Sequence, residues 1–358
     1  MIQKPLTIGK EQLSLLEKLC NAVGVSGCEG EIRKIIFTEL ESAADEIKVD
    51  ALGNVLVTRL AKTGDHPLRI MLDAHMDEVG FMIVADEGEG LYSFSIVGGI
   101  DERQLPGKPV WVGSDHFPGV IGAKPIHLTE HDELHSNIPL NTLRIDLGPG
   151  GAGKVKVGDY ATFATKFMQI GPSLRGKALD DRIGVATLIE LVKHAPENVT
   201  LLVSFAVQEE IGGRGAKVAA YRFDPDLAIA VDSTPAFDLP REDGEENTVY
   251  NSRLGQGPAI YISDVGTISD PRLIRFLTHT AESLHIPYQF RQPGGGGTDA
   301  GSIHKVREGI PSVSISIPGR YAHTANLISM TSDWKNTLQL LYALVGKLTP
   351  SILAGDRD

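Results

Sequence analysis

The chain has 358 residues, with 34 basic and 46 acidic side chains, and carries a formal charge of −12 when histidine is neutral. Its apolar content of 42% is enough for a folded core and excludes disorder as the main state. The acidic balance argues against nucleic acid and against an anionic membrane as partners. Two cysteines cannot form a disulfide framework, and no apolar run is long enough to span a bilayer, so we expect a cytoplasmic protein.

Helical and strand-like patterns alternate at both ends of the chain. Residues 10–22 carry apolar residues at helical spacing, and Ser26 with Glu29 fits a Ser-x-x-Glu capping box for a helix through Leu40. Strand-like segments follow as far as LRIMLDAHMD. In the second half the predicted order is helix 182–194, strand 199–207, helix 214–221, strand 227–231, helix 271–284, strand 288–292, helix 299–306, strand 312–317 and helix 333–348.

The pattern changes between about residues 80 and 165. Short strand-like runs are separated there by glycine, proline and aspartate turns, without a strong helical pattern, which predicts a small all-β insert. We therefore expect an α/β domain that is discontinuous in sequence, made of residues 1–70 and 168–358, with residues 78–166 inserted. The alternation of helices and strands predicts a mixed, mostly parallel sheet flanked by helices.

Side chains that bind metals recur next to these elements. Glutamates and an aspartate directly follow apolar strands, and in open α/β sheets ligands bind beyond the carboxyl ends of the strands. Acidic groups stacked there would repel one another unless cations neutralised them. Histidine and carboxylate ligands suit zinc, cobalt or manganese, and two histidines with three carboxylates can hold two metals if one carboxylate bridges. The candidates are His75, Asp180, Asp181, Glu209, Glu210, Asp232 and His323.

Two of these motifs also suggest supporting roles. In His75-Met76-Asp77, strand alternation places residues 75 and 77 on one face, so Asp77 could accept the second ring N–H of His75. In the Glu209–Glu210 pair, adjacent carboxylates point in different directions. One can bind metal while its neighbour acts as general base.

The ordered set of motifs resembles the glutamyl/deblocking aminopeptidase family. These tetrahedral aminopeptidases are dinuclear metallopeptidases, and some members carry an old cellulase or endoglucanase label. The resemblance spans residues 24 to about 325. The motifs that carry it are AHMDEVG, GGIDERQLPG, GKALDDRIG, QEEIGGRGA, AVDST, GQGPAI, GGGTDAGSIH and IPGRYAHT.

The resemblance implies a zinc-exopeptidase-like α/β domain with an inserted, barrel-like dimerisation domain. It implies that Asp180 bridges two divalent metals, that His75 and Asp232 complete one site, and that Glu210 and His323 complete the other. Glu209 would be the general base, with Asp77 as a second catalytic residue. The predicted activity is removal of N-terminal residues from peptides by a metal-activated water, in homodimers that assemble into dodecamers. As substrate-binding residues we name Gly296, Gly297, Thr298, Asp299 and Arg320.

Other functions compete with this prediction. A related two-metal carboxypeptidase or deacylase would need a cation for a substrate carboxylate, and Arg291 and Arg320 are available. A glycoside hydrolase would need two positioned carboxylates, usually without a metal. A non-catalytic assembly homologue would keep the fold without the chemistry, although all five predicted ligands and the base are present.

Overall fold

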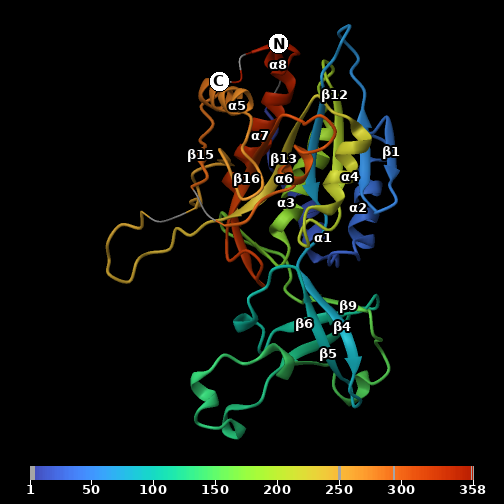
Figure 1. Cartoon of the computed structure of the whole chain (residues 1–358), viewed down its shortest axis with the longest axis vertical. Coiled ribbons are helices and arrows are strands. Elements are labelled where there is room, and N and C mark those ends of the chain that lie inside the picture. Colours follow the sequence, from blue (N-terminus) through green and yellow to red (C-terminus); the bar gives the residue numbers. More distant parts are fainter. Residues whose placement is uncertain (1–4, 249–250, 293–294, 356, 358) are drawn as a thin grey trace.

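The computed structural model describes residues 5–248, 251–292, 295–355 and 357. Figure 1 shows a layered α/β body and, at the opposite end of the molecule from both termini, a separate β-barrel. The predicted α/β class with an inserted β structure is confirmed. Within the described ranges, no helix combines the length and the apolar character that crossing a bilayer requires.

The central sheet has eleven strands among the described residues and is mixed. Its middle strands β12, β3, β13 and β16 are parallel, whereas the pairs toward both edges are antiparallel. Outside this centre, only the short strands β14 and β15 pair in parallel among the described residues. The strands are β1 (Glu46–Val49), β2 (Val55–Arg59), β3 (Arg69–His75), β10 (Met168–Ile170), β11 (Ser173–Gly176), β12 (Thr200–Ala206), β13 (Leu227–Pro235), β14 (Ala259–Ile260), β15 (Gln289–Phe290), β16 (Ser312–Arg320) and β17 (Leu327–Met330).

Helices cover both faces of this sheet. Strand alternation turns Ile70 and Leu72 of β3 toward one apolar cluster, which includes residues of α1, α2, α3, α5 and α7, and turns Met71 toward a second cluster with α4 and α6. Because both faces are covered, β12 is buried along its whole length, and β3 is buried at every residue except Arg69. The helices are α1 (Lys10–Asn21), α2 (Gly30–Leu40), α3 (Leu179–Lys193), α4 (Arg214–Phe223), α5 (Pro271–Ser283), α6 (Ala300–Ile303), α7 (Thr331–Lys347) and α8 (Ser351–Ala354).

Six antiparallel strands between β3 and β10 close into a barrel in the order β4-β5-β8-β7-β6-β9. The barrel has its own apolar core, in which Phe81 meets Phe163 edge to face with ring centroids 5.3 Å apart. Short 3₁₀ turns η1 (Glu102–Gln104) to η5 (Pro149–Gly151) connect the strands. The strands are β4 (Gly80–Asp86), β5 (Leu91–Val97), β6 (Pro109–Val112), β7 (Phe117–Gly122), β8 (Arg144–Asp146) and β9 (Tyr160–Phe163).

The predicted capping box at the start of α2 is wrong. The Ser26 hydroxyl donates to the Asp77 carboxylate at 2.6 Å, and Glu29, which is itself the N-cap residue, accepts from the Gly27 N–H at 2.7 Å. The Ser26 hydroxyl therefore binds a residue distant in sequence, although the local pattern predicted that it would cap the helix. Strand β13 also continues beyond the predicted end at Val231 and includes Asp232.

Candidate metal centre

The candidate ligands come from four neighbouring parallel strands and one helix. His75 ends β3, Asp232 lies near the end of β13, and Glu209 and Glu210 follow β12. His323 follows β16, and Asp180 lies in the first turn of α3, where the Asp180–Asp181 peptide is cis. Because parallel strands end at the same edge of the sheet, residues far apart in sequence meet there.

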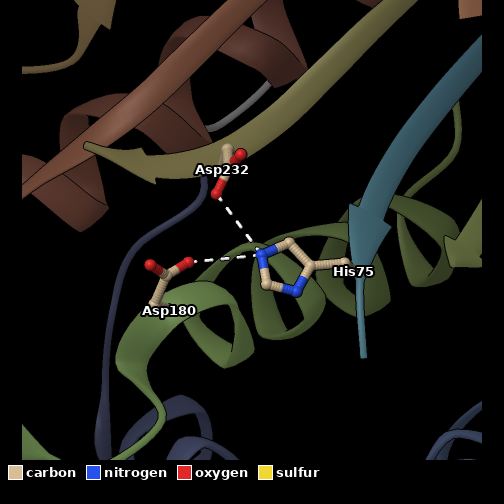
Figure 2. A group of neighbouring side chains, drawn as sticks. All are labelled: His75, Asp180 and Asp232. Atoms are coloured by element: carbon tan, nitrogen blue, oxygen red, sulfur yellow. Dashed lines mark hydrogen bonds and ion pairs between the residues drawn. The ribbon is translucent and has the colours of Figure 1, made fainter. Parts of the chain in front are cut away.

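The first group consists of His75, Asp180 and Asp232. The His75 Nε2 atom lies 3.2 Å from Asp180 Oδ1 and 3.6 Å from Asp232 Oδ1. Figure 2 shows the imidazole of His75 pointing between the two carboxylates. The three possible ligand atoms lie within 4.8 Å of one another, which is close enough to share one metal ion.

The second group consists of Asp180, Glu210 and His323. The His323 Nε2 atom lies 3.2 Å from Glu210 Oε2 and 3.5 Å from Asp180 Oδ2. Asp180 thus belongs to both groups, with one carboxylate oxygen facing each histidine. This is the placement that a bridging ligand needs.

Asp77 lies directly behind both groups. Its fully buried carboxylate accepts from the backbone N–H of Glu209 at 3.0 Å and from that of Glu210 at 3.2 Å. The nearest acceptor for His75 Nδ1 is the Asp77 carbonyl oxygen at 3.1 Å, whereas the carboxylate lies 3.6 Å away. Asp77 therefore fixes the start of the Glu209–Glu210 segment as well as the His75 ring.

The crowding of acids shifts the pKa values of the site. Burial raises the pKa of Glu209 to about 8 and that of Asp232 to about 6, and it also raises the pKa of Glu210. Burial opposes protonation of His323, but hydrogen bonding to Asp180 and the charge of Glu210 raise its pKa to about 10. Both shifts, the raised pKa values of the carboxyls and of His323, mean that the site binds protons, and hence positive charge, more readily than the free side chains do.

This donor set fits divalent metals. Each group offers one imidazole nitrogen and two carboxylates, a combination that suits zinc, cobalt or manganese. The His75, Glu210 and Asp180 side chains are at most 13% exposed, so the protein shields them from water. Cations would relieve the repulsion among these acids.

A cavity of about 490 Å³ opens over the two groups. Among the predicted substrate-binding residues, Gly296 and Gly297 line it. Thr298 and Asp299 are buried beside it, with the Thr298 hydroxyl 2.7 Å from that of Ser314, and they do not line the cavity. Arg320 is not among the residues that line the cavity, and its Nε lies 2.6 Å from the Asp238 carboxylate.

Several lining residues were not predicted from the sequence. Gly99, Asp101 and Gln104 come from the barrel, within the motif GGIDERQLPG, which had received no role. Tyr261 follows β14 and Arg291 follows β15, and the guanidinium stacks over the phenol ring at 4.8 Å. The sequence singled out Arg291 only as a cation for the carboxypeptidase or deacylase alternative, and no sequence signal marks Tyr261, because only the pairing of β14 with β15 brings the two together.

Comparisons with known proteins agree with this geometry. The family model of the M42 glutamyl aminopeptidases matches residues 53–340. The chain is 37% identical to a protein of Acetivibrio thermocellus that is described as an aminopeptidase, over 93% of this chain and 98% of that protein. It is 30% identical to the glutamyl aminopeptidase of Lactococcus lactis, over 96% of this chain and 98% of the relative.

Solved structures show the same fold. The TET aminopeptidase of a marine sediment archaeon, Thaumarchaeota archaeon SCGC AB-539-E09, superposes with a TM-score of 0.90 at 33% identity, over 96% of this chain and 98% of that one. The TET1 peptidase of Pyrococcus horikoshii, described as assembling into a tetrahedron or a large octahedral shell, gives a TM-score of 0.82 at 34% identity, over 94% of this chain and 100% of that one. The chain therefore belongs to the M42 glutamyl aminopeptidase family, whose members hydrolyse peptide bonds at the N-termini of peptides.

Proposed function

We propose that the protein is a two-metal aminopeptidase. In this proposal the first group, His75, Asp180 and Asp232, holds one divalent metal, and the second group, Asp180, Glu210 and His323, holds the other. The observation that carries the proposal is the position of Asp180, whose two oxygens face different histidines. The donor types leave zinc, cobalt and manganese as candidates.

Glu209 is the proposed general base. Glu209 lines the cavity, and its backbone N–H donates to the Asp77 carboxylate. This hydrogen bond fixes the backbone of Glu209 just after β12. Glu209 removes a proton from the attacking water, holds it while the tetrahedral intermediate forms, and delivers it to the leaving amine. When bound, the metals would supply Lewis acidity, which lowers the pKa of water and stabilises negative charge on the scissile carbonyl oxygen.

We propose peptides with a free N-terminus as substrates. The acidic residues of the cavity attract an α-ammonium group, and the backbone of Gly296 and Gly297 leaves room for the chain beside them. Thr298, Asp299 and Arg320 support the cavity from outside its lining rather than contacting substrate. The Arg320–Asp238 ion pair leaves Arg320 poorly placed for a carboxypeptidase or deacylase role. Arg291, the other cation named for that alternative, lines the cavity, so the substrate assay below separates the two activities.

The barrel is the proposed dimerisation domain, with boundaries at about residues 78 and 166, and the dimers assemble into a dodecamer. The exposed apolar side chains that the barrel segment carries, such as Ile126 and Leu128, support this role, as does the TET peptidase likeness. Cys20 and Cys28 are both free thiols, which supports a reducing, cytoplasmic location.

The decisive experiment replaces Glu209 with Gln. The metal content per chain should remain at two by elemental analysis, while the hydrolysis of aminoacyl-p-nitroanilides falls at least a hundredfold, in line with the ~10²–10⁴-fold worth of a general base. Glu17→Gln, an exposed glutamate on α1, is the matched control and should keep wild-type activity.

Two other results would contradict the proposal. Wild-type turnover by the Glu209→Gln variant would exclude this residue as the base. Hydrolysis of N-acyl amino acids in preference to aminoacyl substrates would favour the deacylase alternative. The assay is run on chelated enzyme to which zinc, cobalt and manganese are added back one at a time, so that the same measurement selects the metal.

A further inference from the structure

The two metal-binding groups differ in what holds their histidines. His75 ends a central strand, its side chain is 3% exposed, and its Nδ1 atom faces the carbonyl of Asp77, two residues away. His323 lies in a loop after β16, and its side chain is 40% exposed. A residue that directly follows the same strand therefore orients the first histidine, whereas the second has its partner elsewhere in the chain.

That partner is a turn of the barrel. The His323 Nδ1 atom lies 2.8 Å from the carbonyl oxygen of Gly99, which follows β5. A carbonyl oxygen only accepts, so Nδ1 carries the hydrogen and donates it. This leaves Nε2 unprotonated when it serves as a ligand, facing Asp180 and Glu210.

The barrel turn, defined here as Gly98 and Gly99, also packs against both ligands that are specific to the second group. A Cβ atom on Gly99 would lie 3.3 Å from His323 Nδ1, and one on Gly98 would lie 3.5 Å from Glu210 Cβ. Gly98 has a φ of +87°, a conformation that favours glycine. The close approach of this turn thus depends on the absence of side chains.

The loop that carries His323 connects the two cores of the molecule. Ala325 is 4% exposed and belongs to the apolar cluster of the barrel, whereas Ala322 packs against the cluster of the α/β body. His323 lies between these two anchors. A displacement of the barrel relative to the sheet would therefore move this ring, while His75 would stay with β3.

We propose that the barrel turn is a positioning element for His323, through which the inserted barrel sets the metal affinity of the second group without changing that of the first. This inference rests on the proposed two-metal centre. It gives the barrel a direct part in building the site, in addition to any part in assembly.

The test replaces Gly99 with Val in the full chain. Gly99 does not have a left-handed φ, so the backbone accepts valine, while the added side chain displaces the His323 ring. Gly150→Val is the matched control. Gly150 lies in the barrel too, between β8 and β9, it also lacks a left-handed φ, and no atom lies within 4 Å of a Cβ added there. The zinc-loaded enzymes are dialysed against increasing chelator concentrations, and the zinc remaining per chain is measured.

We expect Gly99→Val to lower the affinity for one of the two metals by ~10–100-fold and to leave the affinity for the other unchanged. A loss of this size is typical when a ligand loses its hydrogen-bond partner. His323→Ala should lower the affinity for the same metal. Adding Gly99→Val to His323→Ala should cause no further loss of affinity, since both changes act through one ring. Gly150→Val should match the wild type.

Two results would overturn the inference. Equal weakening of both metals, or an additive loss in the double variant, would show that the valine disturbs the fold rather than one histidine. Wild-type affinity for both metals would show that the turn does not position the ring. A wild-type enzyme that binds fewer than two metals would instead contradict the proposed function itself, so the two failures are distinguishable.

Discussion

Asp180 faces both histidines of the candidate metal centre, and this shared position makes its loss different from the loss of any other candidate ligand. Burial favours the neutral form of its carboxyl, but hydrogen bonds from His323 and His75 hold its pKa well below the usual range, so it is ionised. An ionised carboxylate with one oxygen in each group can serve as a ligand in both proposed sites at once.

Asp180→Ala should therefore lose both metals, whereas Asp232→Asn should weaken metal binding by the first group only. Dialysis against metal-free buffer followed by elemental analysis measures both variants. Two metals per chain in Asp180→Ala would refute the bridging role. Loss of both metals from Asp232→Asn would show that the two groups are not separable.

Asp333, at the start of α7, allows a pH prediction away from the metal centre. Its carboxyl accepts from the N–H groups of Gly255 and Gly257, yet burial raises its pKa to about 6. A raised pKa means that the folded state binds the proton more tightly than the unfolded state. The resulting stabilisation is present below about pH 4 and is lost as the pH rises through about 6.

The wild type should thus lose up to about 3 kcal/mol of stability relative to Asp333→Asn between about pH 4 and pH 7, because the asparagine stays neutral. Urea unfolding of both proteins across this range measures the difference. A difference that is constant with pH would show that this carboxyl has an ordinary pKa in the folded protein.

At the scale of elements, a buried ion cluster joins the end of β3 to α3 and to the barrel. Lys177 Nζ lies 2.6 Å from the Glu78 carboxylate, which also faces Arg182 at 3.4 Å and accepts from Thr162 of β9 at 2.9 Å. Arg182 in turn donates to the Met76 carbonyl at 2.8 Å, beside His75. All three charged side chains of the cluster are at most 2% exposed.

Glu78→Gln should lower the unfolding free energy by about 3–5 kcal/mol, because it leaves buried cations without their counter-ion. Lys177→Met in the same chain should recover part of that loss, because one unpaired charge is then removed. Urea denaturation of the two single variants and the double variant gives the coupling. Additive losses would mean that the two residues do not act as a pair.

The residues that the sequence predicted as ligands lie together in the structure, whereas much of the cavity around them was not predicted. His75, Glu209, Glu210 and Asp232 lie at or near strand ends, where apolar runs give way to polar residues, so the pattern marks them directly. Tyr261 reaches the cavity only through the pairing of short strands, which no local pattern shows.

Local patterns failed where a distant partner intervened. Ser26 matches a capping box in sequence, but its hydroxyl donates to the Asp77 carboxylate instead of capping α2. The antiparallel pair of β11 with β17 likewise joins segments far apart in the chain, which helix–strand alternation does not reveal. Tertiary contacts decided these features, and spacing in sequence does not encode them.

At the scale of the whole molecule, the proposed dimerisation through the barrel can be tested by its exposed apolar residues. Ile126 is 75% exposed and Leu128 is 59% exposed on the η2 turn (Ile126–Leu128). Ile126→Asp with Leu128→Asp should reduce a dodecamer of about 460 kDa toward the 38.5 kDa single chain, because buried charges oppose association. Light scattering after gel filtration measures the mass.

Leu60→Asp is the control for this prediction, since Leu60 is 58% exposed but lies after β2, outside the barrel. It should keep the wild-type mass. An unchanged mass in the double variant would exclude this turn as part of the contact, and a single-chain mass for the wild type would exclude the assembly altogether.

For the proposed two-metal centre, the insertion of the barrel between β3 and β10 also sets the order in which the two groups are completed as the chain is made. His75 is synthesised early, but Asp232 follows only with β13, and His323 comes about 250 residues after His75. The first group becomes complete once β13 pairs with β3. The second must wait until the loop after β16 docks on a barrel that was synthesised long before, so a newly made chain would bind its two metals in a fixed order.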